Sequence, residues 1–181
     1  PTVDDLSGVI ALTLMLRKMG KHATAVVSGA VPKNLDFLNS NEIIEKDVNS
    51  MRDFVISLSK EKADKLRYKV EDNNVKIFIT PYKTTLEEKD FKFGQGDFNA
   101  DAVVAVGVAK RDELDSVVRE HSGILHKAKV MSLKNGAKGN GFGNIDWQEA
   151  SASSVSEMLV SISEALGTGL MDGQIATALL T

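Results

Sequence analysis

The sequence contains no cysteine, which excludes disulfide bonds, thiolate metal sites and a cysteine nucleophile. It also lacks an excess of positive charge. Its net charge is −3, so no overall basic field favours non-specific binding to nucleic acid. No apolar run reaches the roughly 20 residues needed to cross a bilayer, and no signal-peptide pattern is present. We therefore expect a cytoplasmic protein without a membrane segment.

The composition is that of an ordinary globular protein. The 181 residues are 43% hydrophobic and 26% charged, which is enough to bury the core of one domain. The chain begins at Pro1 with a helix signal directly after it and no strand before it. We expect it to be a fragment of a longer protein.

Helix and strand patterns alternate over most of the chain. The pattern predicts a buried helix over residues 4–20, started by Asp4 or Asp5, and then a buried strand over 22–29. The alternation resumes with a strand over 100–109, a helix over 110–121, a strand over 127–133, and helices over 153–167 and from 172 onward. This order predicts an α/β fold with a mostly parallel sheet flanked by helices.

Residues 50–98 interrupt the alternation with a β-rich insertion. The pattern predicts a strand over 53–59, a hairpin over 66–81 that turns at residues 72–74, and a loop over 84–99. The hairpin offers an edge for a partner, and its Lys and Arg residues would then form a partner surface or protect the edge from aggregation. The sequence does not separate these two interpretations.

Ligands of an open parallel sheet bind at the carboxyl ends of the strands. Three segments are expected there: PTVDDLSG at the start, the end of AVVAVG, and the glycine-rich stretch LKNGAKGNGFGN over residues 133–144. Loops from three separate elements that meet at one edge would form a metal or phosphate site.

These segments resemble, in order and spacing, the three motifs of the DHH phosphoesterases, a family that includes nanoRNases and bifunctional oligoribonuclease-phosphatases. The similar stretches are residues 1–20, 100–114 and 130–159, with a close match at Phe142, Gly143, Ile145, Asp146 and Trp147. The resemblance implies a Rossmann-like DHH domain over residues 1–181 with a small β-hairpin insertion. It also implies that the family's C-terminal substrate-binding domain is absent from this chain.

Family members hold two divalent ions, usually manganese, with the aspartates and histidines of these motifs. The positions that correspond to those ligands are here Thr2, Asp4, Gly107, Lys134, Asn135 and Gly136, and Gly139 replaces the asparagine that follows. One carboxylate cannot hold two ions, and the ammonium of Lys134 opposes a cation at its position. We therefore expect no cofactor and no hydrolysis, and interpret the domain as a binding or structural module.

The alternative is a Mn²⁺-dependent phosphoesterase that acts on short oligonucleotides or phosphorylated nucleotides. It would need ligands from outside this segment, or a shifted site built on Asp4, Asp5 and Asp146. Expected partners are a nucleotide or short oligonucleotide, a protein partner or a second copy of the chain.

Two further hypotheses concern the lysines. Lys134 could replace the lost metal and pair with Asp4, or it could be an accident of an unconstrained loop. The backbone of the glycine-rich stretch, with Lys134, Lys138, Gly139 and Gly141, could bind an anion, although a plain surface loop is favoured.

The remaining polar and aromatic candidates favour structural roles. His22, His121 and His126 match no motif position. Hydroxyl side chains at a helix start usually cap it, which is the interpretation for Ser153, Ser154 and Ser156. Phe142 and Trp147 could stack on a base, but packing beneath the loop is the more common role.

Overall fold

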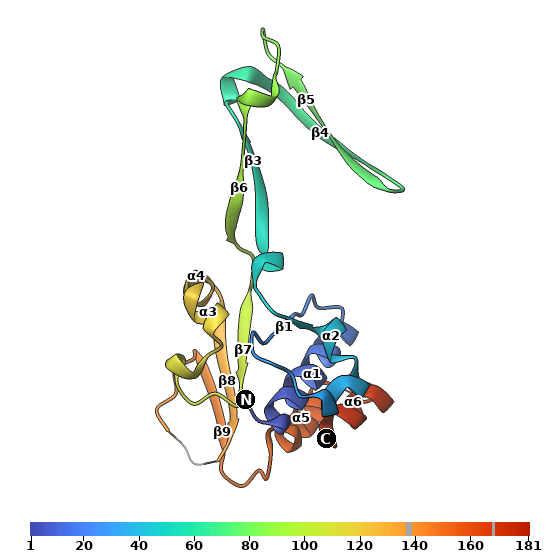
Figure 1. The fold of residues 1–181 in the computed structure, drawn as a ribbon, viewed down its shortest axis with the longest axis vertical. Coiled ribbons are helices and arrows are strands. Elements are labelled where there is room, and N and C mark those ends of the chain that lie inside the picture. The colour runs from blue at the N-terminus through green and yellow to red at the C-terminus, as the bar shows by residue number, and fades with distance from the viewer. Residues whose placement is uncertain (137–138, 168) are drawn as a thin grey trace. The chain divides into compact units, whose positions relative to one another are not determined.

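The computed structural model describes residues 1–136, 139–167 and 169–181 (Figure 1). The chain divides into a first unit, residues 1–51 with 99–181, and a second unit, Arg52–Phe98. With 38% helix, 30% strand and parallel sheets, the predicted α/β class is confirmed. Lys138 of the predicted anion site lies outside the described residues. None of the described helices combines the length and apolar character needed to cross a membrane.

A three-stranded parallel sheet forms the centre of the first unit. Its order is β7-β8-β9, with β7 at Ala102–Val106, β8 at Lys129–Asn135 and β9 at Ile145–Glu149. One face packs against α5 (Val155–Leu166) through the cluster Val106, Leu133, Val155, Met158 and Leu159. The other face contributes to the cluster Ala105, Leu114, Leu125 and Val130. The sheet is therefore covered on both sides, as the apolar runs of β7 and β8 predict.

The segment that covers the second face of the sheet is divided into more helices than the sequence predicted. A single helix was expected over 110–121, but the structure has a 3₁₀ turn at Arg111–Glu113 and helices α3 (Ser116–Glu120) and α4 (Gly123–Lys127). The physical reason is a second start signal: the side chain of Asp115 accepts a hydrogen bond from the Val117 amide and begins α3.

The first and last helices bury a second core. Helix α1 (Val3–Lys18) and α6 (Gly173–Leu179) pack with a two-residue parallel pair, β1 (Ala25–Val26) and β2 (Ile44–Glu45). The segment between the two strands holds a 3₁₀ helix, Lys33–Leu38, and α2, Ser40–Ile43, and a 3₁₀ turn at Asn49–Met51 follows β2. The strand expected over 22–29 is much shorter, and beyond its carboxyl end the Ser28 amide donates to the Asp115 carboxylate instead of to a strand.

The start of α1 differs from the expected cap. Thr2 is the N-cap: its hydroxyl accepts a hydrogen bond from the Asp5 amide, and the Asp5 carboxylate accepts one from the Thr2 amide. This reciprocal pair is a capping box. Asp4, which the sequence analysis offered as a cap of this helix, bonds elsewhere.

The second unit consists of two antiparallel ribbons. Strand β3 (Arg52–Leu58) pairs with β6 (Phe91–Phe98), and β4 (Ala63–Glu71) pairs with β5 (Asn74–Pro81). The β4–β5 hairpin confirms the predicted hairpin. The predicted loop over 84–99 was wrong, because its last half is β6. Gly94 and Gly96 made this segment resemble a loop in the sequence. A Cβ at Gly96 would lie 2.8 Å from a methyl group of Val55 on β3. Glycine at this position therefore permits the close approach of the partner strand.

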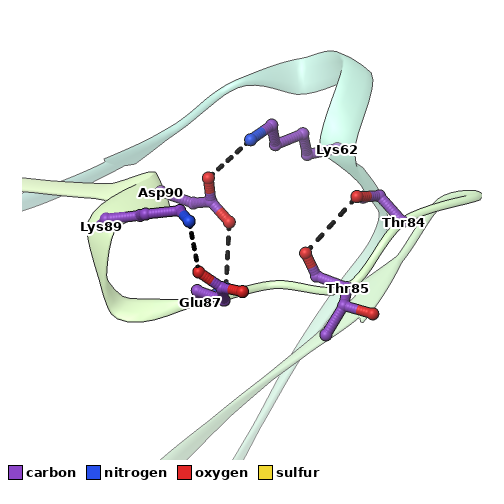
Figure 2. A network of polar contacts seen from close by, with 6 residues as sticks. All are labelled: Lys62, Thr84, Thr85, Glu87, Lys89 and Asp90. Carbon is purple, nitrogen blue, oxygen red and sulfur yellow. Dashed lines mark hydrogen bonds and ion pairs between the residues drawn. The ribbon is translucent and has the colours of Figure 1, made fainter.

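A small polar network joins the connections between the ribbons (Figure 2). Two 3₁₀ turns, Lys60–Lys62 and Glu88–Asp90, are linked by the ion pair of Lys62 Nζ with Asp90 Oδ1 at 2.5 Å. The lysine ammonium and the Glu87 amide both bind the Asp90 carboxylate and lower the pKa of Asp90, the ammonium being the larger cause.

Candidate functional site

The positions expected to carry metal ligands lie at the carboxyl ends of β7 and β8 and at the start of α1. Gly107 follows the last residue of β7, and its amide donates to the carbonyl of Leu133 on β8 at 2.8 Å. Lys134 and Asn135 are the last two residues of β8. These contacts place the ends of β7 and β8 side by side, as the sequence predicted.

Gly107 lies directly against Asp5. A Cβ at Gly107 would be 1.9 Å from Oδ1 and 2.3 Å from Cγ of Asp5, and the backbone of Gly107 has a φ of +71°. Side chains of L residues are disfavoured at this φ. An aspartate at this position would therefore need both a strained backbone and a displaced Asp5.

Asp4, the one carboxylate among the positions expected to carry metal ligands, is bound to the start of α5. Its Oδ2 accepts a hydrogen bond from the Val155 amide at 2.8 Å, and its Oδ1 accepts from the amide and the hydroxyl of Ser156 at 3.1 and 2.7 Å. Free amides and the positive end of the helix dipole favour a carboxylate at this place. Asp4 thus joins α1 to the start of α5, although Asp4 and Val155 are 151 residues apart in the sequence.

Asn135 and Gly136 are also engaged by the backbone. The side-chain amide of Asn135 donates to the carbonyl of Ser153 at 3.3 Å, and the Gly136 amide donates to the carbonyl of Glu149 at 3.0 Å. Gly136 has a φ of +99°. A histidine there, as the family motif has, would be strained in the same way as a side chain at Gly107.

The hypothesis that Lys134 pairs with Asp4 is wrong in this structure. Among the described residues, no ion pair includes Lys134. Lys134 is half-buried and lies in register with Gln148 of β9. The hydrogen-bond donors of α5 satisfy the carboxylate of Asp4 instead.

The glycine-rich stretch does not stay at the carboxyl edge of the sheet. It returns toward the amino ends of the strands, where the Asn144 amide donates to the Val130 carbonyl at 2.7 Å. The Asn144 side chain in turn accepts from the Val130 amide at 2.8 Å. The connection must run this way because β8 and β9 are parallel, with Met131 in register with Ile145.

Side chains of β9 accept hydrogen bonds from backbone amides of the glycine-rich stretch. The Gly139 amide donates to Gln148 Oε1 at 2.5 Å, and the amides of Phe142 and Gly143 both donate to Asp146 Oδ1 at 3.1 Å. A bound anion would have to displace these internal acceptors. The predicted anion binding by Lys134, Gly139 and Gly141 stays a prediction, with this competition against it.

Asp146 accepts three hydrogen bonds at a single oxygen, Oδ1. The Ser132 hydroxyl donates to its Oδ1 and is the largest cause that lowers the pKa of Asp146, followed by the Gly143 amide and, more weakly, the Phe142 amide. Partial desolvation opposes them. Gly141 packs against the same group, since a Cβ there would lie 2.1 Å from the Cγ of Asp146.

Of the three serines expected to cap the start of α5, Ser154 does so, whereas the hydroxyls of Ser153 and Ser156 donate to carboxylates. The Ser154 hydroxyl accepts a hydrogen bond from the Glu157 amide at 3.0 Å. The Ser153 hydroxyl donates to Glu157 Oε2, and the hydroxyl of Ser156 donates to Asp4. These contacts are structural.

The aromatic and imidazole side chains also make structural contacts. Trp147 packs against the Val106–Leu133 cluster, and Phe142 packs against the cluster that contains Val130. His121 Nδ1 lies 2.9 Å from the Val117 carbonyl. His22 and His126 are both exposed.

Among the described residues, no three His, Asp or Glu side chains gather in a position to hold a metal ion. The shifted site on Asp4, Asp5 and Asp146 is therefore not assembled here. No protein-family model matches the chain, and no curated protein matches it. Ser132 and Gln148, which the sequence analysis missed, carry only a weak local signal, since they are polar residues within strands.

Proposed function

We propose that the first unit is a degenerate DHH-like domain that has no hydrolytic activity and acts as a binding or structural module. The observation that carries this proposal is the set of three hydrogen bonds between the Asp4 carboxylate and the start of α5. The only carboxylate that survives at the motif positions is thereby used to hold two helices together.

Two glycines support the same conclusion. Gly107 and Gly136 occupy positions where the family has an aspartate and a histidine, and both have positive φ. The backbone itself thus differs from one that would present ligands, so the loss goes beyond single side chains. Ligation of a metal would also require Asp4 to leave the amides of α5, which would then lose their acceptor.

The test is a manganese titration by calorimetry, together with hydrolysis assays on a dinucleotide and on a generic phosphodiester. We expect no micromolar binding of Mn²⁺ and no turnover by a protein whose circular dichroism shows that it is folded. Binding of two ions with turnover, abolished by Asp4→Ala, would establish the Mn²⁺-dependent phosphoesterase instead. A nucleotide titration in the presence of a chelator tests the metal-free binding role separately.

A further inference from the structure

One face of the β4–β5 ribbon is built only from apolar side chains. In an antiparallel pair, residues in register point to the same face, and every second residue along a strand shares it. Leu66 is in register with Ile79, Tyr68 with Ile77, and Val70 with Val75. The apolar ribbon face consists of these six residues: Leu66, Tyr68, Val70, Val75, Ile77 and Ile79.

This face is open to solvent. Five of its six side chains are between 54% and 75% exposed, and Ile79 is half-buried. The patch is on the order of 500 Å², at the upper end of what monomeric proteins expose. A two-stranded ribbon in water is at most marginally stable and needs a third strand or a packed face. Packing of another surface against the apolar ribbon face would therefore stabilise the ribbon.

The opposite face of the same ribbon is charged. It carries Lys65, Arg67, Lys69 and Lys76, and Glu71 pairs with Lys69 at 3.1 Å and with Lys76 at 2.7 Å. Phe78 also lies on this face, where the Arg67 guanidinium is 5.0 Å from the centre of its ring. The apolar ribbon face, by contrast, carries no charged residue. The hairpin was expected to interact through its edge, whereas its exposed apolar residues lie on one face.

We propose that the apolar ribbon face packs against the same face of a second copy of the chain. The face contains no charge, so two copies related by a two-fold axis meet without repulsion, and the cationic faces stay in water. Two such ribbons would stack face to face at the roughly 10 Å spacing of packed sheets. A second copy is also present in equal amount whenever the chain is made.

The area sets the expected strength. Two copies would remove on the order of 1,000 Å² from water, which is the lower limit for a specific interface. We therefore expect a reversible dimer that forms at micromolar concentration. This inference does not depend on whether the first unit is an enzyme, because the face lies wholly within the second unit.

The primary test is the mass of the full chain by sedimentation velocity and native mass spectrometry, from about 1 to about 100 µM. We expect a monomer–dimer equilibrium. The double variant Tyr68→Thr with Ile77→Thr should weaken it at least tenfold. The control is Lys69→Thr with Lys76→Thr, which replaces the neighbouring register pair on the opposite face with threonine. This control should leave the dimerisation constant nearly unchanged. A monomer at every concentration, or a series of larger assemblies, would overturn the proposal.

A second test uses the absence of native cysteine. A single thiol can link only two copies, so Tyr68→Cys is treated with a bis-maleimide of about 10 Å, the spacing of packed sheets. We expect covalent dimers from Tyr68→Cys and little from Lys69→Cys, although the Lys69 side chain is 66% exposed. Equal cross-linking of the two variants, or none from Tyr68→Cys in a folded protein, would contradict face-to-face packing.

Discussion

The carboxylate of Asp5 fills the space that a side chain at residue 107 would need. A Cβ at Gly107 would lie 1.9 Å from Oδ1 of Asp5, and the positive φ of Gly107 independently disfavours a side chain. The two residues come from α1 and from the end of β7, so this contact fixes the first helix against the sheet edge.

The first prediction concerns Gly107→Ala. Its backbone strain costs about 1 kcal/mol and the clash with Asp5 adds about 1–3 kcal/mol, so we expect about 2–4 kcal/mol of destabilisation in chemical denaturation. Gly20→Ala is the matched control, because Gly20 has a φ of +75° but no atom within 4 Å of its added Cβ. It should lose only about 1 kcal/mol. Equal losses in the two variants would show that the contact with Asp5 has no steric consequence.

The second prediction concerns Asp4→Ala, which removes the acceptor from the start of α5. We expect a loss of about 2 kcal/mol in the free energy of unfolding, with a smaller loss for Asp4→Asn, which keeps one carbonyl oxygen. Asp112→Ala is the control, because Asp112 is exposed and its side chain bonds to none of the described residues. If Asp4→Ala were as stable as Asp112→Ala, the link between α1 and α5 would not contribute to stability.

The third prediction concerns pH and Asp146. Hydrogen bonds from Ser132 and Gly143 lower the pKa of Asp146 below its ordinary value of 3.8. A carboxylate with a lowered folded-state pKa stabilises the protein above its unfolded-state pKa, and this contribution is lost as the pH falls through the folded-state pKa. The difference in unfolding free energy between wild type and Asp146→Asn should therefore be largest at neutral pH. It should disappear as the pH falls below 3.8, the ordinary pKa of an aspartate.

Thermal unfolding of wild type and Asp146→Asn, from neutral pH to below the ordinary aspartate pKa of 3.8, checks the prediction. Asp112→Asn provides the baseline for replacing an exposed aspartate. A difference for Asp146→Asn that did not change with pH would mean that ionisation of Asp146 is not linked to folding.

The fourth prediction concerns restoration of the family triplet by Lys134→Asp, Asn135→His and Gly136→His together. We expect a less stable protein without micromolar Mn²⁺ binding, since residue 136 has a φ of +99° and Asp4 is bound to α5. Calorimetry on the folded triple variant, with wild type as reference, measures this. Tight binding of manganese would show that the backbone still accommodates the ligands.

The local sequence was sufficient to predict elements whose signals are local. Periodic apolar residues predicted α5, nearly continuous apolar residues predicted α1 and the strands β7 and β8, and the turn expected at residues 72–74 predicted the β4–β5 hairpin. Strand β6 was missed because its glycines resemble a loop, and their reason lies on the partner strand at Val55. The Ser154 cap of α5 was predicted because a cap and its amide are neighbours in the chain.

By itself the sequence determined the α/β class and the place of the β-rich segment between the parts of the first unit. Only the tertiary structure decided what the remaining groups do. Asp4 and Ser156, or Asp5 and Gly107, are far apart in the chain, so no local pattern reports that they touch. Hydrogen bonds and steric contacts depend on distances in space, and folding alone sets these distances between remote residues.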